Sequence, residues 1–180
     1  ILIGRPAVIE RRIEKLGLRI RAGVDFDLTN IDDDPRFNSY WQRYHELMER
    51  RGVNPDAAKA IVRSRVTVVA ALMLDRGEAD AMICGIVGRF QRKLQHILSV
   101  IPRDPGVASL AALTAVANDR GTFFFLDTHV QADPTAEQLA EATLQAAYRL
   151  RLFGIPPKIA LLSHSNFGSH DNPSAIKMRK

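Results

Sequence analysis

The stretch PKIALLSHSNFGS, Pro157 to Ser169, contains the sequence transition that decides the fold class of this chain. Its apolar first half is typical of a strand, and it stops abruptly at a run of small hydroxyl residues, a histidine, an asparagine and a glycine. In a protein whose strands alternate with helices, ligands bind at the carboxyl ends of the strands. The stretch therefore predicts a ligand-binding loop, against the alternative of an ordinary polar turn.

Apolar patterns of the strand type and of the helix type alternate along the rest of the chain. Strands are expected at residues 1–4, 24–28, 79–85, 121–126 and 157–163. Helices are expected at residues 7–16, 37–51, 55–76, 89–101, 135–153 and 174–180. The small apolar residues 107–118 fit either state, and we favour a strand because it would form a hairpin with 121–126. This alternation predicts an α/β fold with a mainly parallel or mixed sheet.

The composition of the chain changes near Pro102–Gly106, which is the candidate boundary between two α/β subdomains. We expect these subdomains at residues 1–104 and 105–180, with a cleft between them. The chain starts without methionine inside an expected strand and stops inside an expected helix. We therefore expect part of a longer protein, incomplete at its C-terminus.

Composition and charge exclude several classes of protein. The chain has 180 residues, of which 46% are hydrophobic, so it can bury a sizeable core. Its formal charge is +5, but the bases are interspersed with acids, which favours a phosphate-bearing small molecule over nucleic acid as partner. Cys84 is the only cysteine, which excludes an internal disulfide and fits a reducing cytoplasm. The longest apolar stretch, Val66–Leu74, is too short to span a membrane.

The loop that follows the strand at 157–163 is the first candidate site. Its small residues leave backbone N–H groups able to meet an anion, and its hydroxyl and amide groups can bind the anion's oxygens. His164 is a weaker candidate, because a single histidine can simply pack. The candidate ligand-binding residues of this loop are Ser163, Ser165, Asn166, Gly168 and Ser169.

Two further loops also follow expected strands. Asp127 and Thr128 end the strand 121–126, where Asp127 either accepts a hydrogen bond from a ligand or caps a turn. Gly85 and Arg89 lie between a strand and a helix, and an arginine in the first turn opposes the helix dipole unless an anion is bound. The spacing of Asp127, His129 and His164 matches no metal pattern, so no metal site is predicted.

Several of these segments together resemble the phosphate acetyltransferase (phosphate acetyl/butyryltransferase) family. The resemblance runs in order over nearly the whole chain and is carried by ADAMICG (79–85), DPTAEQLAE (133–141), FGIPPKIALLSHSNFGS (153–169) and SAIKMR (174–179). YHELMERRG (44–52), HSNFGS and KMR are similar to one branch, the phosphotransacetylase-like C-terminal domain of bacterial NADP-dependent malic enzymes. The resemblance implies a phosphotransacetylase-like fold, of the type also found in isocitrate and isopropylmalate dehydrogenases.

The chain departs from the family where the family carries arginines. The family pattern YxELRxxKG has an arginine at the position of Met48, and SGAxHTTAxTxRP has its second basic position at Gln95. In the same segment Arg89 and Phe90 replace a pair of hydroxyl residues. Arginines bind the phosphate and stabilise the charge that develops during acetyl transfer, so both losses argue against efficient turnover.

The resemblance implies a ligand cleft that binds acetyl-CoA without catalysis. Its expected lining is Gly85, Arg89, Asp127, Thr128, Ser163, Ser165, Asn166, Gly168, Ser169 and Lys177. No catalytic residue, metal or cofactor is expected within the chain. NADP and Mg²⁺ or Mn²⁺ are implied only for the parent malic enzyme, which converts malate to pyruvate and CO₂. The implied partners are acetyl-CoA, the N-terminal domains of the same chain and further copies in a homo-oligomer, with no membrane and no nucleic acid.

Two other readings remain open. One is an active phosphate acetyltransferase or butyryltransferase, which the overall match favours. The other is a purely structural oligomerisation module, which the small apolar residues 107–117 would suit.

Overall fold

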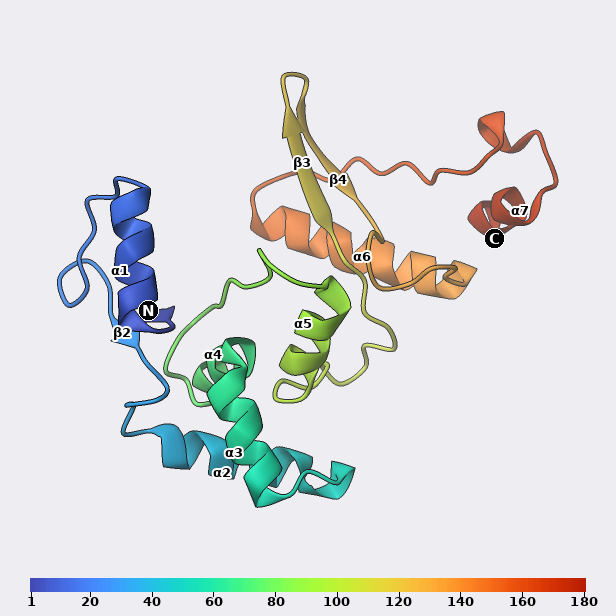
Figure 1. The fold of residues 1–180 in the computed structure, drawn as a ribbon. Helices are drawn as coiled ribbons and strands as arrows, with labels where there is room; N and C mark the ends of the chain where they lie inside the picture. Colours follow the sequence, from blue (N-terminus) through green and yellow to red (C-terminus); the bar gives the residue numbers. More distant parts are fainter. The chain divides into compact units, whose positions relative to one another are not determined.

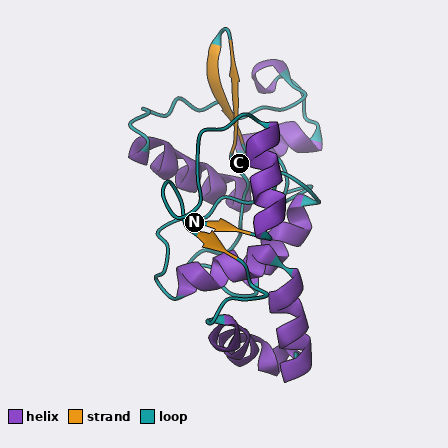
Figure 2. Cartoon of the chain, turned by 60° about the vertical axis from the view of Figure 1, so that its left-hand side comes forward, coloured by secondary structure: helices purple, strands orange, loops and turns teal.

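The computed structural model describes the backbone of residues 1–180 and every side chain except that of Phe167. It divides into two compact units, unit 1 (Ile1–Arg103) and unit 2 (Asp104–Lys180), and each is described by itself (Figure 1). Helices and strands alternate in both units, which confirms the α/β class. Most of the chain is helix or loop, and the strands are short (Figure 2). No described helix is long and apolar enough to cross a membrane.

Unit 1 is mainly helical and carries one short parallel strand pair. Its elements are β1 (Leu2–Ile3), α1 (Pro6–Lys15), β2 (Leu28–Thr29), α2 (Phe37–Met48), the 3-10 turn η1 (Glu49–Arg51), α3 (Pro55–Ser64), α4 (Val66–Asp75) and α5 (Phe90–Leu98). β1 and β2 pair with Leu2 opposite Leu28.

The core of unit 1 forms around α4, which is apolar on nearly all sides. Val68, Val69, Ala71 and Leu72 are fully buried, and α2, α3 and α5 pack around them. Tyr40 of α2 is also fully buried in this cluster. Burying each large apolar side chain stabilises the fold by about 1.5–3 kcal/mol, so this helix anchors the unit.

A cluster of five polar residues, the Arg36 cluster, joins the start of α2 to the end of α4. Arg36 donates to Asp34 at 2.7 and 2.9 Å and to Glu78 at 2.9 Å. Glu78 also accepts from the Tyr40 hydroxyl at 2.5 Å and pairs with Arg76 at 2.6 Å. The hydrogen bond from Arg36 lowers the pKa of Asp34, and burial followed by the bond to Glu78 raises that of Tyr40. These charges therefore satisfy one another.

Local signals place most helix ends where the sequence predicts them. Asn54 caps α3 by accepting from Ala57 N–H at 2.8 Å, with Pro55 at the first helical position. Gly52 ends the preceding turn with φ of +84°, a conformation that glycine adopts without strain. Thr135 forms a full capping box with Gln138 at the start of the helix in unit 2.

Unit 2 consists of a hairpin, one long helix and a short helix near the C-terminus. Its elements are β3 (Thr114–Asn118), β4 (Gly121–Phe125), α6 (Ala136–Leu152), the 3-10 turn η2 (Asn166–Gly168) and α7 (Pro173–Arg179). β3 and β4 pair antiparallel with Asn118 opposite Gly121, which confirms the predicted hairpin. In α6 the residues Ala142, Ala147 and Leu150 are buried.

The helix expected at 55–76 is two helices, which corrects the prediction. Arg65 has φ −126° and ψ 86°, so the chain changes direction between α3 and α4. The Ser64 hydroxyl donates back to the carbonyl of Ala60 at 2.7 Å, which competes with the helical bonds at this point. The change of direction lets the mostly apolar α4 enter the core, and no side chain caps the N-terminus of α4.

The strands expected at 79–85 and 157–163 are wrong for this structure, where both segments are extended loops. Ile83 is 97% exposed and Leu162 is 74% exposed. An extended segment becomes a strand only when a neighbour accepts its backbone hydrogen bonds, and no described strand lies beside either segment.

Two other expected strands are shorter than predicted. In the segment 24–28 only Leu28 belongs to a strand, because a turn closed by Arg21 N–H and the Asp25 carboxylate at 2.7 Å takes up the rest. In 107–118 only Thr114–Asn118 pairs.

Candidate functional site

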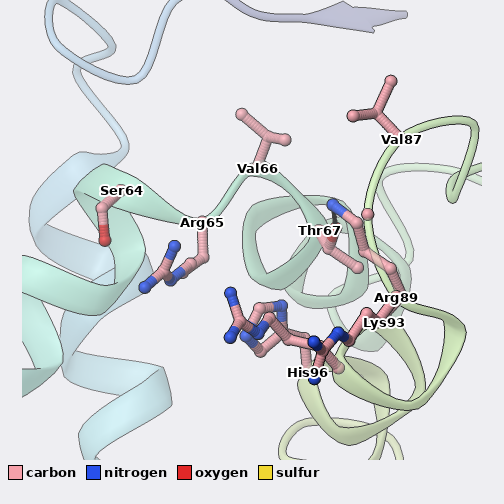
Figure 3. A pocket seen from close by; sticks show the side chains of 10 residues that line it. Ser64, Arg65, Val66, Thr67, Val87, Arg89, Lys93 and His96 are labelled. Atoms are coloured by element: carbon pink, nitrogen blue, oxygen red, sulfur yellow. Dashed lines mark hydrogen bonds between the residues drawn. The ribbon is translucent and has the colours of Figure 1, made fainter.

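A pocket in unit 1 is lined almost entirely by basic and small side chains, and we call it the basic pocket. It has a volume of about 410 Å³ and lies between the start of α4 and the face of α5 (Figure 3). Its lining residues are Ser64, Arg65, Val66, Thr67, Val87, Gly88, Arg89, Arg92, Lys93 and His96. The lining contains no carboxylate, so the pocket is suited to an anion.

The basic residues of the basic pocket come from two places in the fold. Arg65 lies at the junction of α3 and α4, and the other four lie on one face of α5 or at its N-cap. Arg89, Arg92, Lys93 and His96 stand at positions i, i+3, i+4 and i+7, so the helical repeat gathers them on that face. Lys93 donates to the hydroxyl of Thr67 at 3.2 Å, which ties α5 to α4.

Two helix N-termini open at the basic pocket. Arg65 is the N-cap of α4 and Arg89 is the N-cap of α5, and neither side chain caps its helix. Neither helix has an acidic residue in its first turn. The partial positive charge of both helix ends therefore adds to that of the side chains.

His96 of α5 is among the side chains that line the basic pocket (Figure 3). Burial lowers the pKa of its imidazole below the ordinary value, and the positive charges of Arg65, Lys93 and Arg92 lower it further. Its Nδ1 atom is buried without a hydrogen-bond partner among the described residues. The ring is therefore neutral at pH 7.

An apolar groove adjoins the basic pocket. It has a volume of about 560 Å³ and is lined by β1, one side of α4 and the extended segment 79–87. The groove shares four lining residues with the basic pocket, namely Val66, Thr67, Val87 and Lys93. An anion-binding end and an apolar arm are thus continuous within unit 1.

The two positions at which the family pattern carries arginines, Met48 and Gln95, offer no cation to this region. Met48, at the end of α2, packs against the hydrophobic core. Gln95 lies on α5 but is exposed and does not line the basic pocket.

The structure places two of the predicted ligand residues in unit 1. Arg89 lines the basic pocket, and Gly85 lines the apolar groove with φ of +106°, which favours glycine. These two predicted residues therefore fall at adjoining cavities. The other eight predicted residues belong to unit 2.

Asp127 holds together the turn after β4. Its carboxylate accepts backbone N–H groups of Ala112, His129, Val130 and Gln131 at 2.8–3.2 Å. Burial alone would raise the pKa of this carboxyl, but the four donors outweigh burial and hold the pKa below its ordinary value. The turn-capping role of Asp127 is therefore evident, and its binding of a ligand stays a prediction.

The neighbouring Thr128 hydroxyl lies 2.6 Å from the hydroxyl of Thr114 in β3. This contact joins the end of the hairpin to its first strand.

The residues Ser163–Ser169, here called the polar loop, bond mainly to their own backbone. The Ser163 hydroxyl accepts from Ser165 N–H at 3.3 Å, and the Ser165 hydroxyl accepts from His170 N–H at 3.0 Å. Asn166 begins η2, and Ser169 follows it.

The contacts of the polar loop continue into α7. The Gly168 carbonyl accepts from Arg179 at 2.7 Å, so α7 packs on η2. Lys177 forms an ion pair with Asp133. The structure therefore brings Gly168, Ser169 and the α7 helix together, and it gives Lys177 a partner of its own.

Sequence reasoning missed most of the basic pocket, namely Arg65, Thr67, Arg92, Lys93 and His96. One signal could have found it, because the 23-residue stretch from Ala81 to Arg103 has no aspartate or glutamate while its bases recur at helical spacing. Arg65 carried no such signal, since it enters the pocket through the unpredicted break between α3 and α4. No group of three or more metal-ligating side chains occurs among the described residues.

Comparison with known proteins places the chain in a family. The model of the family described as "Phosphate acetyl/butaryl transferase" matches residues 1–180. Among solved structures, the EutD phosphotransacetylase from Staphylococcus aureus superimposes with a TM-score of 0.78 at 21% identity, over 99% of this chain and 53% of that chain. A phosphotransacetylase from Streptococcus pyogenes gives the same TM-score at 25% identity and 52% coverage of that chain. The predicted phosphotransacetylase-like fold is confirmed.

Sequence relatives indicate the branch of the family. The NADP-dependent malic enzyme of Escherichia coli (strain K12) is 52% identical over 180 residues, all of this chain and 24% of that enzyme. The NAD-dependent malic enzyme of Rhizobium meliloti is 50% identical over 179 residues. The phosphate acetyltransferase of Escherichia coli is 29% identical over 180 residues. The chain thus spans about a quarter of the malic enzymes it matches and is more similar to them than to this acetyltransferase.

Proposed function

The chain belongs to the phosphate acetyl/butaryl transferase family, and on that premise we propose that it is a non-catalytic domain that binds acetyl-CoA and regulates a malic enzyme of the same polypeptide. Its resemblance to malic enzymes of about 50% identity supports the second half of this proposal. The binding of acetyl-CoA is inferred from the two cavities of unit 1.

The observation that carries the proposal is the continuity of the basic pocket with the apolar groove. Acetyl-CoA has phosphate groups at one end and a long, weakly polar arm that ends in the acetyl thioester. Arg65, Arg89 and Arg92 would bind the phosphates, since guanidinium groups form strong charge-assisted bonds with them. The groove would receive the arm beside Gly85, where the backbone allows close approach.

The chain lacks the two arginines that the family pattern supplies for acetyl transfer. Transfer to phosphate requires cations that stabilise the charge developing on the carbonyl and on the phosphate, and loss of one such group costs about 10²–10³ in rate. Met48 packs against the hydrophobic core, and Gln95 carries no charge. Binding and transition-state stabilisation are separable, so a cleft without these cations can still hold acetyl-CoA.

Regulation follows from the chemistry of the parent enzyme that the relatives imply. Malate oxidation yields pyruvate, and acetyl-CoA reports on the use of pyruvate downstream, so we infer feedback inhibition in the cytoplasm. NADP and the divalent metal would belong to other parts of that chain. Association of these domains into an oligomer would let one binding event bias a two-state arrangement.

The proposal is tested on the full-length protein by following malate-dependent reduction of NADP with and without acetyl-CoA. We expect acetyl-CoA to lower the rate, with free CoA plus acetate as the matched control for its separate parts. An unchanged rate at an acetyl-CoA concentration shown by calorimetry to saturate the protein would contradict regulation.

The rival function is active transfer of an acyl group between CoA and phosphate, favoured by the family match over the whole chain. It predicts formation of acetyl-CoA from acetyl phosphate and CoA. Turnover above the rate without protein would establish this rival and contradict the proposal that the domain is non-catalytic.

A further inference from the structure

The cations of the basic pocket are arranged in a way that costs stability when the pocket is empty. Arg89, Arg92 and Lys93 share one face at the start of α5, and like charges at i,i+3 and i,i+4 spacing destabilise a helix. Arg65 and Arg89 also stand at helix N-caps, where positive charge opposes the dipole. No ion pair links Arg65, Arg89 or Arg92 to a carboxylate among the described residues. Both unfavourable features would be offset by one anion in the pocket.

We propose that the basic pocket binds a single phosphate-class dianion, either free or as the phosphate group of an ester, and that His96 takes up a proton from solvent when the pocket fills. The inference concerns the same pocket as the proposed function and deepens it. It does not depend on the acetyl group, so it can hold where acetyl-CoA regulation fails.

The donors of the pocket match a tetrahedral dianion. Guanidinium groups offer paired N–H donors, Lys93 offers an ammonium group, and the Thr67 hydroxyl lies 3.2 Å from that ammonium. The N-terminal ends of α4 and α5 both line the pocket, so the partial positive charges of both helix ends act on a bound anion. Figure 3 shows Arg65 and His96 on opposite elements with the pocket between them.

His96 makes the affinity of the pocket for an anion depend on pH, because the charged groups around this histidine set its pKa. The charged groups that face it are Arg65 from the α3–α4 junction and Arg92 and Lys93 from α5, all of them positive. In the empty pocket burial and these three cations keep the ring neutral. A bound dianion reverses the sign of the local field, which favours the protonated ring.

Sulfate is the probe for this inference, because it stays doubly charged between pH 5 and 8 and its affinity then reports the protein alone. We would titrate the full chain with sulfate by calorimetry at pH 5.5, 6.5 and 8, in two buffers of different ionisation enthalpy to count protons. We expect saturable binding that is about tenfold tighter at pH 5.5 than at pH 8, because the protonated ring adds a positive charge beside the anion at the lower pH. Proton uptake should accompany binding near pH 6.5.

The variant His96→Gln should bind sulfate with the same affinity at all three pH values. His170→Gln, an exposed histidine in unit 2, is the matched control and should keep the full pH dependence. Absence of saturable sulfate binding would overturn the site. Retention of the pH dependence in His96→Gln, or its absence in the wild type, would overturn the role of His96.

Competition then identifies the source of the anion. One result is displacement of sulfate by acetyl-CoA with an inhibition constant equal to the dissociation constant measured for acetyl-CoA alone. That result would assign the pocket to the phosphate groups of CoA, as the proposed function requires. Displacement by inorganic phosphate but not by acetyl-CoA would assign it to the free ion. That second result supports the dianion site and contradicts the placement of acetyl-CoA in this pocket, so the two ideas fail separately.

Discussion

The basic pocket of unit 1 and the polar loop of unit 2 both offer many polar side chains, but they use them in opposite ways. In the polar loop the hydroxyls of Ser163 and Ser165 accept from the loop's own backbone. In the basic pocket, Lys93 donates to the Thr67 hydroxyl, and no carboxylate is among the residues that line the pocket. A cluster whose members satisfy one another supports the fold, and a cluster of one charge sign without partners is available to a ligand.

The Arg36 cluster shows the same contrast within unit 1. Its arginines bond to Asp34 and Glu78, so they hold α2 against α4 rather than binding a ligand. Counting basic residues would not separate this cluster from the basic pocket. The presence or absence of neighbouring carboxylates does.

The largest expected effect comes from removing two charges from the basic pocket. Each charge-assisted hydrogen bond is worth about 1.5–3 kcal/mol, so Arg89→Gln with Arg92→Gln should weaken acetyl-CoA binding at least about a hundredfold. Calorimetry measures this loss. Arg11→Gln with Arg12→Gln on α1 is the matched control for the change in net charge and should leave the affinity within about twofold of wild type, because exposed charges at a distance are screened by salt. If both double variants lost the same affinity for acetyl-CoA, the loss would come from the change in net charge and not from the basic pocket.

Removal of the Asp127 carboxylate should chiefly affect stability. Asp127→Ala strands up to four backbone N–H groups, and we expect about 2–3 kcal/mol of destabilisation, since each unsatisfied buried donor costs about 1–3 kcal/mol and some will find water. Thermal unfolding and hydrogen exchange at Val130 and Gln131 would detect it. Asp133→Ala, exposed and near the start of α6, is the control.

The pH dependence of this contribution has a definite sign. The pKa of Asp127 is lower in the folded protein, so its stabilisation is present above the unfolded pKa of about 4 and is lost as the pH falls through the folded value. Asp127→Asn should therefore flatten the stability profile below about pH 4. If Asp127→Asn instead weakens acetyl-CoA binding tenfold at unchanged stability, the ligand role predicted for Asp127 would be established. Unit 2 would then also contribute a ligand-binding residue.

The smallest expected effect comes from the polar loop. A neutral hydrogen bond contributes about 0.5–1.5 kcal/mol, so Asn166→Ala should weaken acetyl-CoA binding by no more than about tenfold if the amide contacts the ligand at all. Asn38→Ala on α2 is a control amide outside both regions. A loss comparable to that of the double arginine variant would move the main binding site to the polar loop.

Local chemistry explains which parts of the fold the sequence predicts well. The caps at Asn54 and Thr135, the glycine stop at Gly52 and the hairpin turn after Asn118 depend on neighbours in the chain, and each lies where expected. The segments 79–85 and 157–163 have the composition of strands, yet a strand also needs a partner for its backbone. The chain spans only about half of the solved phosphotransacetylases that it matches, so part of that fold lies outside it.

The candidate site was predictable only in part, for the same reason. Arg89 and Gly85 stand in a loop between two elements, which sequence position reveals. Arg92, Lys93 and His96 join them through the helical repeat, but Arg65 joins them only because α3 ends at Ser64 and α4 leaves in another direction. Proximity created by a change of chain direction has no signature in the residues that it brings together.

The central claim, that this domain binds acetyl-CoA without transferring its acetyl group, is tested most directly by one paired measurement. Acetyl-CoA would be titrated into the protein by calorimetry, and the same sample would then be assayed for transfer of acetyl from acetyl-CoA to phosphate. We predict saturable binding with no acetyl phosphate above the background without protein. Acetyl phosphate formation would show that Met48 and Gln95 are compatible with catalysis, and absence of binding would contradict the claim altogether.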